Sequence, residues 1–291
     1  MTALALKAAL QYLVAPPPIP SPSVKTVEDA SFSDLDAGNE TECYIWAVGA
    51  IHADAKELKG LHQRLKPKLR PNHHLVYLGN YFGYGQESKA VYKELQEFGQ
   101  FFKAEPRGKL VYLRGQQEEM MSRLLQLEYA PDPLAVLQWV EQQGVMEALE
   151  GFGLSWALLR MAAYCGERAL GDWTQAARHY LYHVPGYYDF IGELKRAAYS
   201  MAANTVMVNS GFDATKPLLQ QQDSYWWDWQ GFEQEEPENH EEFRLIVRGY
   251  DPLNRGLARG LYRLNLDGGS GRGGKLYAAL ISPKGVALQW L

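Results

Sequence analysis

Histidine is the side chain that most often binds catalytic metals and transfers protons near neutral pH. The sequence contains seven, at positions His52, His62, His73, His74, His179, His183 and His240. His179 and His183 lie four residues apart in the sequence HYLYH, a spacing that suits metal binding on one face of a helix. No acidic residue completes such a site locally, so two half-buried helix histidines are the preferred interpretation. His73 and His74 follow the polar sequence RPN and are expected in a solvated turn.

Cysteine and serine are the other candidate nucleophiles. Cys43 and Cys165 are too few for a disulfide scaffold or a thiolate metal cluster. Cys165 lies in an apolar, helical segment and is expected in the core. Ser210 has no histidine at a recognisable triad spacing, so the sequence gives little support for a serine nucleophile.

Composition restricts the function classes further. A chain of 291 residues that is 46% hydrophobic and 22% charged can bury a sizeable core, which excludes global disorder. The net charge of −5 argues against nucleic-acid binding, which requires basic residues to neutralise phosphates. The apolar stretch 1–15 is too short to span a membrane and lacks the pattern of a secretory leader, so a cytoplasmic location is expected.

The first 42 residues are predicted to form a short helix and a linker. Leu6, Leu10 and Leu13 stand at helical spacing, and the proline-rich sequence PPPIPSPSV that follows should be extended. Residues 26–42 are predicted to form a polar surface connector. The helix could dock on the protein's own body or on a partner, and the sequence leaves both open.

Strands and helices are predicted to alternate from residue 43 onward. Each of three apolar runs ends near a glycine and precedes a helix; the runs are 44–48, 75–78 and 110–113, and the helices are 54–65, 88–102 and 118–127. This order indicates an α/β core with parallel strands, whose carboxyl ends gather the chemistry. Residues 131–202 are predicted to be mostly helical. Further strands are predicted at 205–208 and 245–247, followed by a hairpin that joins 261–266 to 276–281 through the glycine-rich loop 267–274.

Five strand-end loops carry a family resemblance. In order they read GAIHA, GNYFGYG, RGQQE, VNSG and GYDP, beginning at residues 49, 79, 114, 208 and 249. They resemble GDIHG, GDYVDRG, RGNHE, VHAG and GHTP of the calcineurin-like metallophosphoesterases, in the bacterial branch of serine/threonine protein phosphatases and diadenosine tetraphosphatases. The resemblance covers almost all of 44–291. It implies an αββα sandwich of two mixed sheets flanked by helices, with a domain at 43–291 and a helical insert at about 120–202.

The resemblance also implies that a metal site has been lost. The family holds two divalent metals such as Mn, Fe or Zn, and only one of its ligand positions keeps its residue type here. The corresponding ligand positions are Ala50, His52, Asn80, Gln116, Asn209 and Tyr250, of which His52 alone is retained. Gln117 stands where the family has its proton-donating histidine. Two divalent cations need anionic oxygens and imidazoles. No metal or other cofactor and no catalytic residue are therefore expected.

These replacements predict a catalytically inactive phosphatase-like protein, or pseudophosphatase, that acts as an interaction, scaffold or regulatory subunit. A protein partner or homo-oligomer is expected, with contacts from the N-terminal leucines and from the tryptophans Trp226, Trp227 and Trp229. One alternative is a binder of a phosphorylated ligand or nucleotide through Arg114 and Arg248, although Arg114 could instead brace loops through Glu118 or a carbonyl. The other alternative is a residual metal-dependent phosphoesterase. The acidic segment 233–242 is expected to be a solvated connector.

Overall fold

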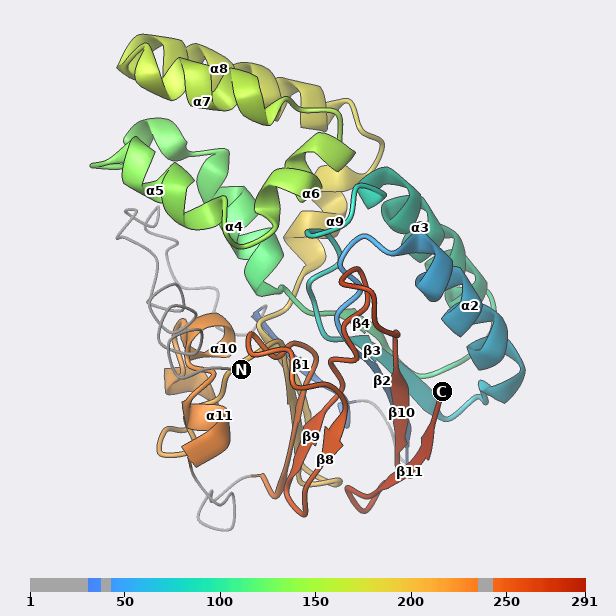
Figure 1. Cartoon of the computed structure of the whole chain (residues 1–291). Helices are drawn as coiled ribbons and strands as arrows, with labels where there is room; N and C mark the ends of the chain where they lie inside the picture. The colour runs from blue at the N-terminus through green and yellow to red at the C-terminus, as the bar shows by residue number, and fades with distance from the viewer. Residues whose placement is uncertain (1–30, 38–42, 235–242) are drawn as a thin grey trace.

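Two mixed β-sheets pack face to face in the computed structural model, and helices lie against the outer face of each (Figure 1). The structure describes residues 31–37, 43–234 and 243–291. The five-stranded sheet has the order β11 (Ala287–Trp290), β10 (Ala278–Ile281), β2 (Tyr44–Val48), β3 (His73–Tyr77) and β4 (Leu110–Tyr112). The six-stranded sheet has the order β1 (Phe32–Asp34), β5 (Ala197–Ser200), β6 (Thr205–Val208), β7 (Leu245–Arg248), β9 (Arg263–Asn265) and β8 (Ala258–Arg259). This arrangement confirms the predicted two-sheet sandwich.

Alternating side chains of the central strands explain why the sheets pack this way. Ile45 and Ala47 of β2 enter the apolar core between the sheets, whereas Trp46 and Val48 enter the core under the helices. Because successive strand residues point to opposite faces, a strand that is apolar throughout must be covered on both sides. The predicted parallel pairing is confirmed, since β2 runs parallel to β3 and β3 to β4.

Helices follow the strands of the five-stranded sheet. They are α2 (Ala55–Leu65), α3 (Ser88–Lys103) and α4 (Gln116–Leu124). Asp54 begins α2, because its side chain accepts a hydrogen bond from the Glu57 N–H at 2.9 Å. An insert of five more helices follows, α5 (Pro133–Val140), α6 (Val145–Gly151), α7 (Trp156–Tyr164), α8 (Glu167–Tyr182) and α9 (Tyr187–Glu193). The short α10 (Ser224–Trp227) and α11 (Gly231–Gln234) lie beside the six-stranded sheet (Figure 1).

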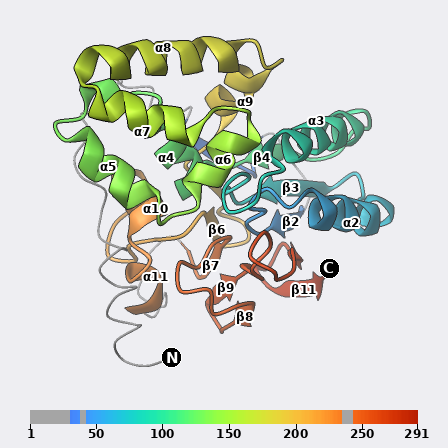
Figure 2. The same ribbon diagram turned by 45° about the horizontal axis from the view of Figure 1, so that its top comes forward.

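The insert projects away from both sheets. In Figures 1 and 2, α7 and α8 lie side by side at the end of the molecule farthest from the strands. None of the helices in the described ranges is both long and apolar enough to cross a membrane.

Two predicted boundaries are wrong. The predicted connector 26–42 contains β1, which pairs in parallel with β5, and Leu35 just after it is fully buried. The predicted helical region 131–202 ends in β5, where Ala198 packs in the core between the sheets and Ala197 packs in the core on the opposite face. Leu6, Leu10 and Leu13 lie outside the described residues.

The predicted hairpin between 261–266 and 276–281 is also wrong. Strand β9 pairs with β7 and β8 in one sheet, while β10 pairs with β2 and β11 in the other. The glycine-rich loop between them crosses from sheet to sheet, because polar side chains fix it to both. Asp267 accepts from the Asp251 N–H at 2.9 Å, and the Ser270 hydroxyl donates to the Ile51 carbonyl at 3.0 Å.

Three of the buried histidines lie in β3 and α2. His73 and His74 lie in β3 rather than in a solvated turn, and they are almost fully buried. The Trp46 indole donates to Nδ1 of His73 at 3.1 Å, and the Lys109 N–H donates to Nδ1 of His74 at 2.7 Å. Because burial penalises the charged imidazole, the pKa of each is lowered to about 4.

His62 on α2 is buried and neutral for the same reason. Its Nδ1 contacts the Glu94 carboxylate at 2.7 Å, and its Nε2 contacts the Tyr77 hydroxyl at 2.8 Å. A neutral ring satisfies both, with Nδ1–H donating and Nε2 accepting. Although Glu94 is close, burial has the larger effect and lowers the pKa of His62 to about 3.

These three histidines predict that acid destabilises the fold. Below about pH 6.5 the unfolded chain protonates them while the folded chain does not, so the free energy of unfolding should decrease as the pH falls from about 7 to about 4.5. Each histidine that takes up a full proton on unfolding contributes about 1.4 kcal/mol per pH unit. Denaturant unfolding at several pH values measures this slope. H62Q should reduce it, and the control Q63A, which changes an exposed residue of the same helix that does not titrate, should leave it unchanged. A slope unaffected by H62Q would contradict the assignment.

Candidate functional site

The loops after five strands meet at one edge of the sandwich. In chain order they follow β2, β3, β4, β6 and β7, and they carry His52, Asn80, Gln116, Asn209 and Tyr250. The His52 N–H donates to the Asn80 carbonyl at 2.9 Å, which joins the first two loops. The Ala50 N–H donates to the Gly249 carbonyl at 2.9 Å, which joins the two sheets. The predicted convergence of these loops at the strand ends is confirmed.

The turns are tight at two of these loops. Gly79 has φ +86°, and a Cβ there would lie 2.6 Å from the Gly115 nitrogen, so only glycine fits. His52 and Asn80 also have positive φ, at 51° and 55°, a region that such residues adopt at an energetic cost.

Glu118 ties two of the loops together. Its carboxylate accepts hydrogen bonds from the N–H groups of Asn80, Tyr81 and Gly115 at 2.9 Å each, and from Phe82 at 3.4 Å. The side chain is buried, and burial raises the pKa of Glu118 while the four N–H donors oppose that shift. Glu118 thus holds the β3 loop against the start of α4.

The amide side chains of the strand-end loops make their hydrogen bonds mainly to backbone. Asn209 donates to the Leu78 carbonyl at 2.7 Å and accepts from the Gln116 N–H at 2.9 Å. Gln117 donates to the Gln143 carbonyl at 2.6 Å, and its N–H donates to Oδ1 of Asn80 at 3.2 Å. These amides therefore serve as fixed connectors between loops.

His52 lies in an aromatic cluster. Its ring packs edge-on against Tyr84 at 4.9 Å and Tyr250 at 5.2 Å between centroids. The Arg272 guanidinium lies 5.3 Å from the centroids of both tyrosine rings, a cation–π geometry. Both ring nitrogens of His52 are buried without a hydrogen-bond partner among the described residues. Burial, together with the Arg272 charge, lowers the pKa of His52 well below its ordinary value, so the ring is neutral.

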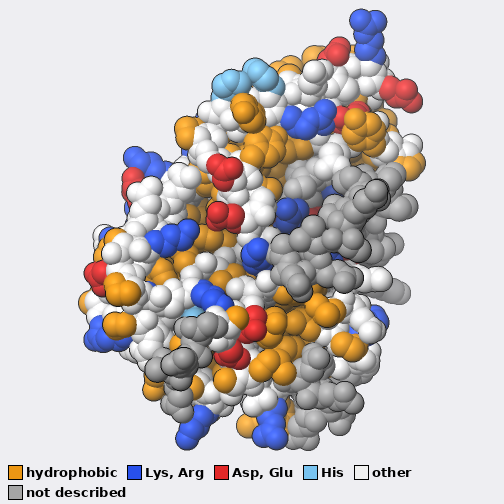
Figure 3. All heavy atoms as spheres, turned by 180° about the vertical axis from the view of Figure 1, so that it is seen from behind, with side chains coloured by type: hydrophobic (Ala, Val, Ile, Leu, Met, Phe, Trp, Pro, Cys, Tyr) orange, Lys and Arg blue, Asp and Glu red, His pale blue; other side chains and the backbone are white. Residues whose placement is uncertain are grey.

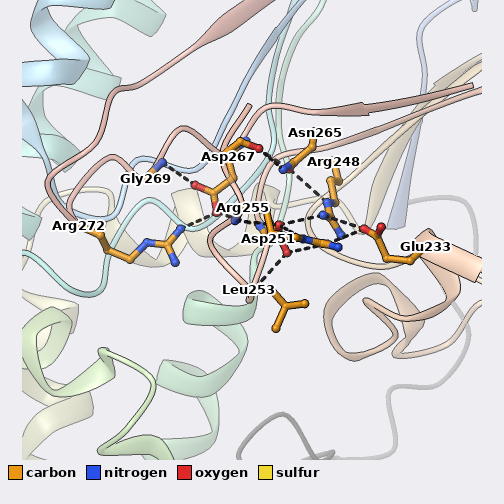
Figure 4. Close-up of polar contacts among 10 residues, drawn as sticks. Glu233, Arg248, Asp251, Leu253, Arg255, Asn265, Asp267, Gly269 and Arg272 are labelled. Carbon is orange, nitrogen blue, oxygen red and sulfur yellow. Dashed lines mark hydrogen bonds and ion pairs between the residues drawn. The ribbon is translucent and has the colours of Figure 1, made fainter. Parts of the chain in front are cut away.

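A network of six charged side chains lies beside this cluster (Figure 4). Its members are Glu233, Arg248, Asp251, Arg255, Asp267 and Arg272. Three positive and three negative charges leave it with no net charge. Sequence reasoning missed this network. Asp251 stands in the fifth motif, with Arg255 four residues later, and Asp267 and Arg272 both lie in the glycine-rich loop, but their pairing was not predicted. Glu233, predicted in a solvated segment, accepts from Arg255 at 2.6 Å.

Both arginines proposed for anion binding are already engaged. Arg248 is buried and ion-paired with Glu233 at 3.0 Å and with Asp251 at 3.2 Å. Arg114 contacts Glu119 at 3.3 Å and donates to the Ile191 carbonyl at 3.3 Å. Arg114 therefore braces loops, as the alternative interpretation held, with Glu119 rather than Glu118 as its acidic partner.

The tryptophans divide between core and surface. Trp226 is buried, and its indole N–H donates to the Arg114 carbonyl at 2.8 Å, so the prediction that Trp226 contacts a partner is wrong. Trp227 and Trp229 are partly exposed. Trp227 packs edge-on against Trp139 of the insert, with 5.5 Å between ring centroids.

The remaining candidates lie apart from the strand-end site or are inaccessible. Ser210 is buried, and its hydroxyl has no partner among the described residues. Cys165 is exposed, so its predicted core position is wrong, because it ends α7 where the chain turns outward. His179 and His183 are exposed rather than half-buried, since they lie on the solvent side of α8.

The residues present do not fit the two divalent metals that the resemblance implies. Within 31–37, 43–234 and 243–291, no three His, Cys, Asp or Glu side chains are grouped so that they could hold a metal ion. His52 supplies one imidazole, while Asn80 and Asn209 are neutral amides whose oxygens accept backbone N–H groups. The fixed Arg272 cation would also repel a metal beside His52.

Removing the Glu118 carboxylate should destabilise the protein strongly. E118A leaves buried N–H groups without an acceptor, and we expect it to lower the free energy of unfolding by about 3 kcal/mol or more. E118Q keeps one acceptor oxygen and should give an intermediate loss. The control E97A removes a surface carboxylate paired with Lys93 and should cost under about 0.5 kcal/mol. Denaturant midpoints test this order, and an E118A loss equal to that of E97A would contradict it.

No protein-family model matches the sequence, and no curated protein matches it. Among solved structures, one described as a "putative diadenosine tetraphosphatase" matches at 15% identity and a TM-score of 0.52, over 89% of this chain and 96% of that chain. A serine/threonine phosphatase from Saccharomyces cerevisiae matches at 12% identity and a TM-score of 0.44, over 95% and 81%. A cold-active protein-tyrosine phosphatase of a psychrophilic Shewanella matches at 12% and 0.47, over 89% and 82%.

The first of these similarities establishes the fold alone, and the other two have TM-scores too low to add to it. Two mixed sheets, helices on both outer faces and five loops converging at the strand ends agree with it. The chain has the fold of the calcineurin-like metallophosphoesterases.

Proposed function

We propose that this protein is a pseudophosphatase, which keeps the phosphatase-like fold without metal-dependent phosphoesterase activity and acts through protein contacts. One observation supports this most directly. The cluster around His52 contains neutral groups and one guanidinium, where the family's chemistry needs acidic ligands. Without a metal, an attacking water keeps a pKa near 15.7 instead of about 7, which corresponds to roughly 12 kcal/mol of ionisation free energy.

A phosphate-binding role has less support. Arg248 and Arg114 are paired with acidic side chains, and the network in Figure 4 has no excess positive charge to offer an anion. A cytoplasmic location stays a prediction.

The contact role is supported by the outer face of α7. Leu158, Met161 and Tyr164 are each more than half exposed, at positions that share one side of the helix. The helix has one charged residue, Arg160, which is paired with Glu141 at 3.1 Å. An apolar, uncharged helix face fits its own symmetry-related copy, so we propose a homo-oligomer formed through α7.

The absence of activity is tested by turnover and metal content. Full-length protein purified without chelator should hydrolyse no aryl phosphate above the buffer rate with Mn²⁺, Fe²⁺ or Zn²⁺ added, because the described residues offer no ligand set for a metal pair. An active metallophosphoesterase run in parallel verifies the assay. Metal-dependent turnover together with stoichiometric Mn, Fe or Zn would overturn the proposal.

The contact role is tested by sedimentation. Wild-type protein should form a concentration-dependent dimer, and L158E/M161E should be monomeric, since it places charges in an apolar interface. K56E on α2 is a control that changes a surface charge away from the insert and should preserve the dimer. A wild-type protein that stays monomeric throughout would remove this part of the proposal and leave the inactivity untouched.

A further inference from the structure

The C-terminal end of α8 carries two exposed histidines one turn apart. His179 and His183 lie with their ring centroids 4.5 Å apart and their planes tilted by 53°. Both side chains are exposed. Figure 3 shows histidine side chains at the upper edge of the molecule, over the insert.

A hydrogen bond fixes which nitrogen of His183 is free. Its Nδ1 lies 2.8 Å from the His179 carbonyl oxygen. A carbonyl can only accept, so Nδ1 carries the hydrogen and Nε2 keeps its lone pair. A metal-binding histidine commonly has this arrangement, in which the second ring nitrogen donates to a carbonyl and orients the first. The backbone of α8 thus prepares His183 as a ligand before any metal arrives.

The neighbouring cations have partners of their own. Arg178 is paired with Glu128 at 2.8 Å, and the Lys89 amine donates to the Tyr180 hydroxyl at 3.0 Å. Neither contact uses an imidazole nitrogen of the pair. Neither of these two contacts therefore blocks an imidazole nitrogen of His179 or His183.

We propose that His179 and His183 form a chelating site for a divalent transition metal that prefers imidazole, such as Cu²⁺, Ni²⁺ or Zn²⁺. Two nitrogen ligands suit these ions, whereas Mg²⁺ and Ca²⁺ require oxygen ligands. The described part of the chain supplies no third His, Cys, Asp or Glu to the site. Water or a side chain of another molecule fills the other coordination positions, so the metal stays exchangeable and open to a second ligand. This inference is independent of the proposed function.

Titration calorimetry on tag-free, full-length protein tests the site after chelator treatment and desalting. We expect one Ni²⁺ per chain and no heat of binding for Mg²⁺. H179A and H183A should each weaken Ni²⁺ binding by about tenfold or more, because the two imidazoles act as linked ligands. H179A/H183A should show no binding. The control H240A, which removes a histidine outside α8, should bind like wild type.

A second readout identifies the ligand atoms directly. The Cu²⁺-loaded protein should show coordination by two imidazole nitrogens in its electron paramagnetic resonance spectrum, and the double variant should not. Unfolding midpoints equal to wild type confirm that the variants fold. No Ni²⁺ binding by wild type, or equal binding by the double variant, would overturn the site. Aryl-phosphate turnover that persists in H179A/H183A would contradict the proposed function alone.

Discussion

The arrangement of the strand-end loops depends on one buried carboxylate. Glu118 lies at the start of α4 and accepts N–H groups from the loop after β3 and from Gly115 after β4. A carboxylate without a counter-ion is stable in such a place only because several backbone donors replace its hydration. These hydrogen bonds therefore fix the spacing between the loop after β3 and the start of α4.

The positive charge beside His52 comes from the Arg272 side chain. The Arg272 guanidinium lies over the rings of Tyr84 and Tyr250. Its Nη2 forms an ion pair with Oδ2 of Asp267 at 2.5 Å. A guanidinium is covalently part of the chain and, unlike a bound metal ion, cannot polarise a water as a Lewis acid.

The sequence predicted those features that depend on local patterns. Apolar runs ending in glycine located the strands, and the motif order located the convergence of the loops. What it missed depends on distant contacts. The burial of His73 and His74 requires β3 to be covered on both faces, and the crossing of 267–274 requires Asp267 to meet Asp251, sixteen residues earlier. Neither the burial nor the hydrogen bond can be predicted from the neighbouring sequence, because the residues involved are common polar types within their own segments.

Strand β1 gives the sandwich an unexpected dependence on its early residues. Three residues pair along β5, and Leu35 is buried behind them. A chain beginning at residue 43, where the motifs begin, would leave the hydrogen-bonding groups of β5 facing solvent at the border of the sheet. Exposed borders of this kind recruit strands from other molecules. Residues 32–35 therefore cover the edge of the sheet at β5, and shortened versions of this protein should retain them.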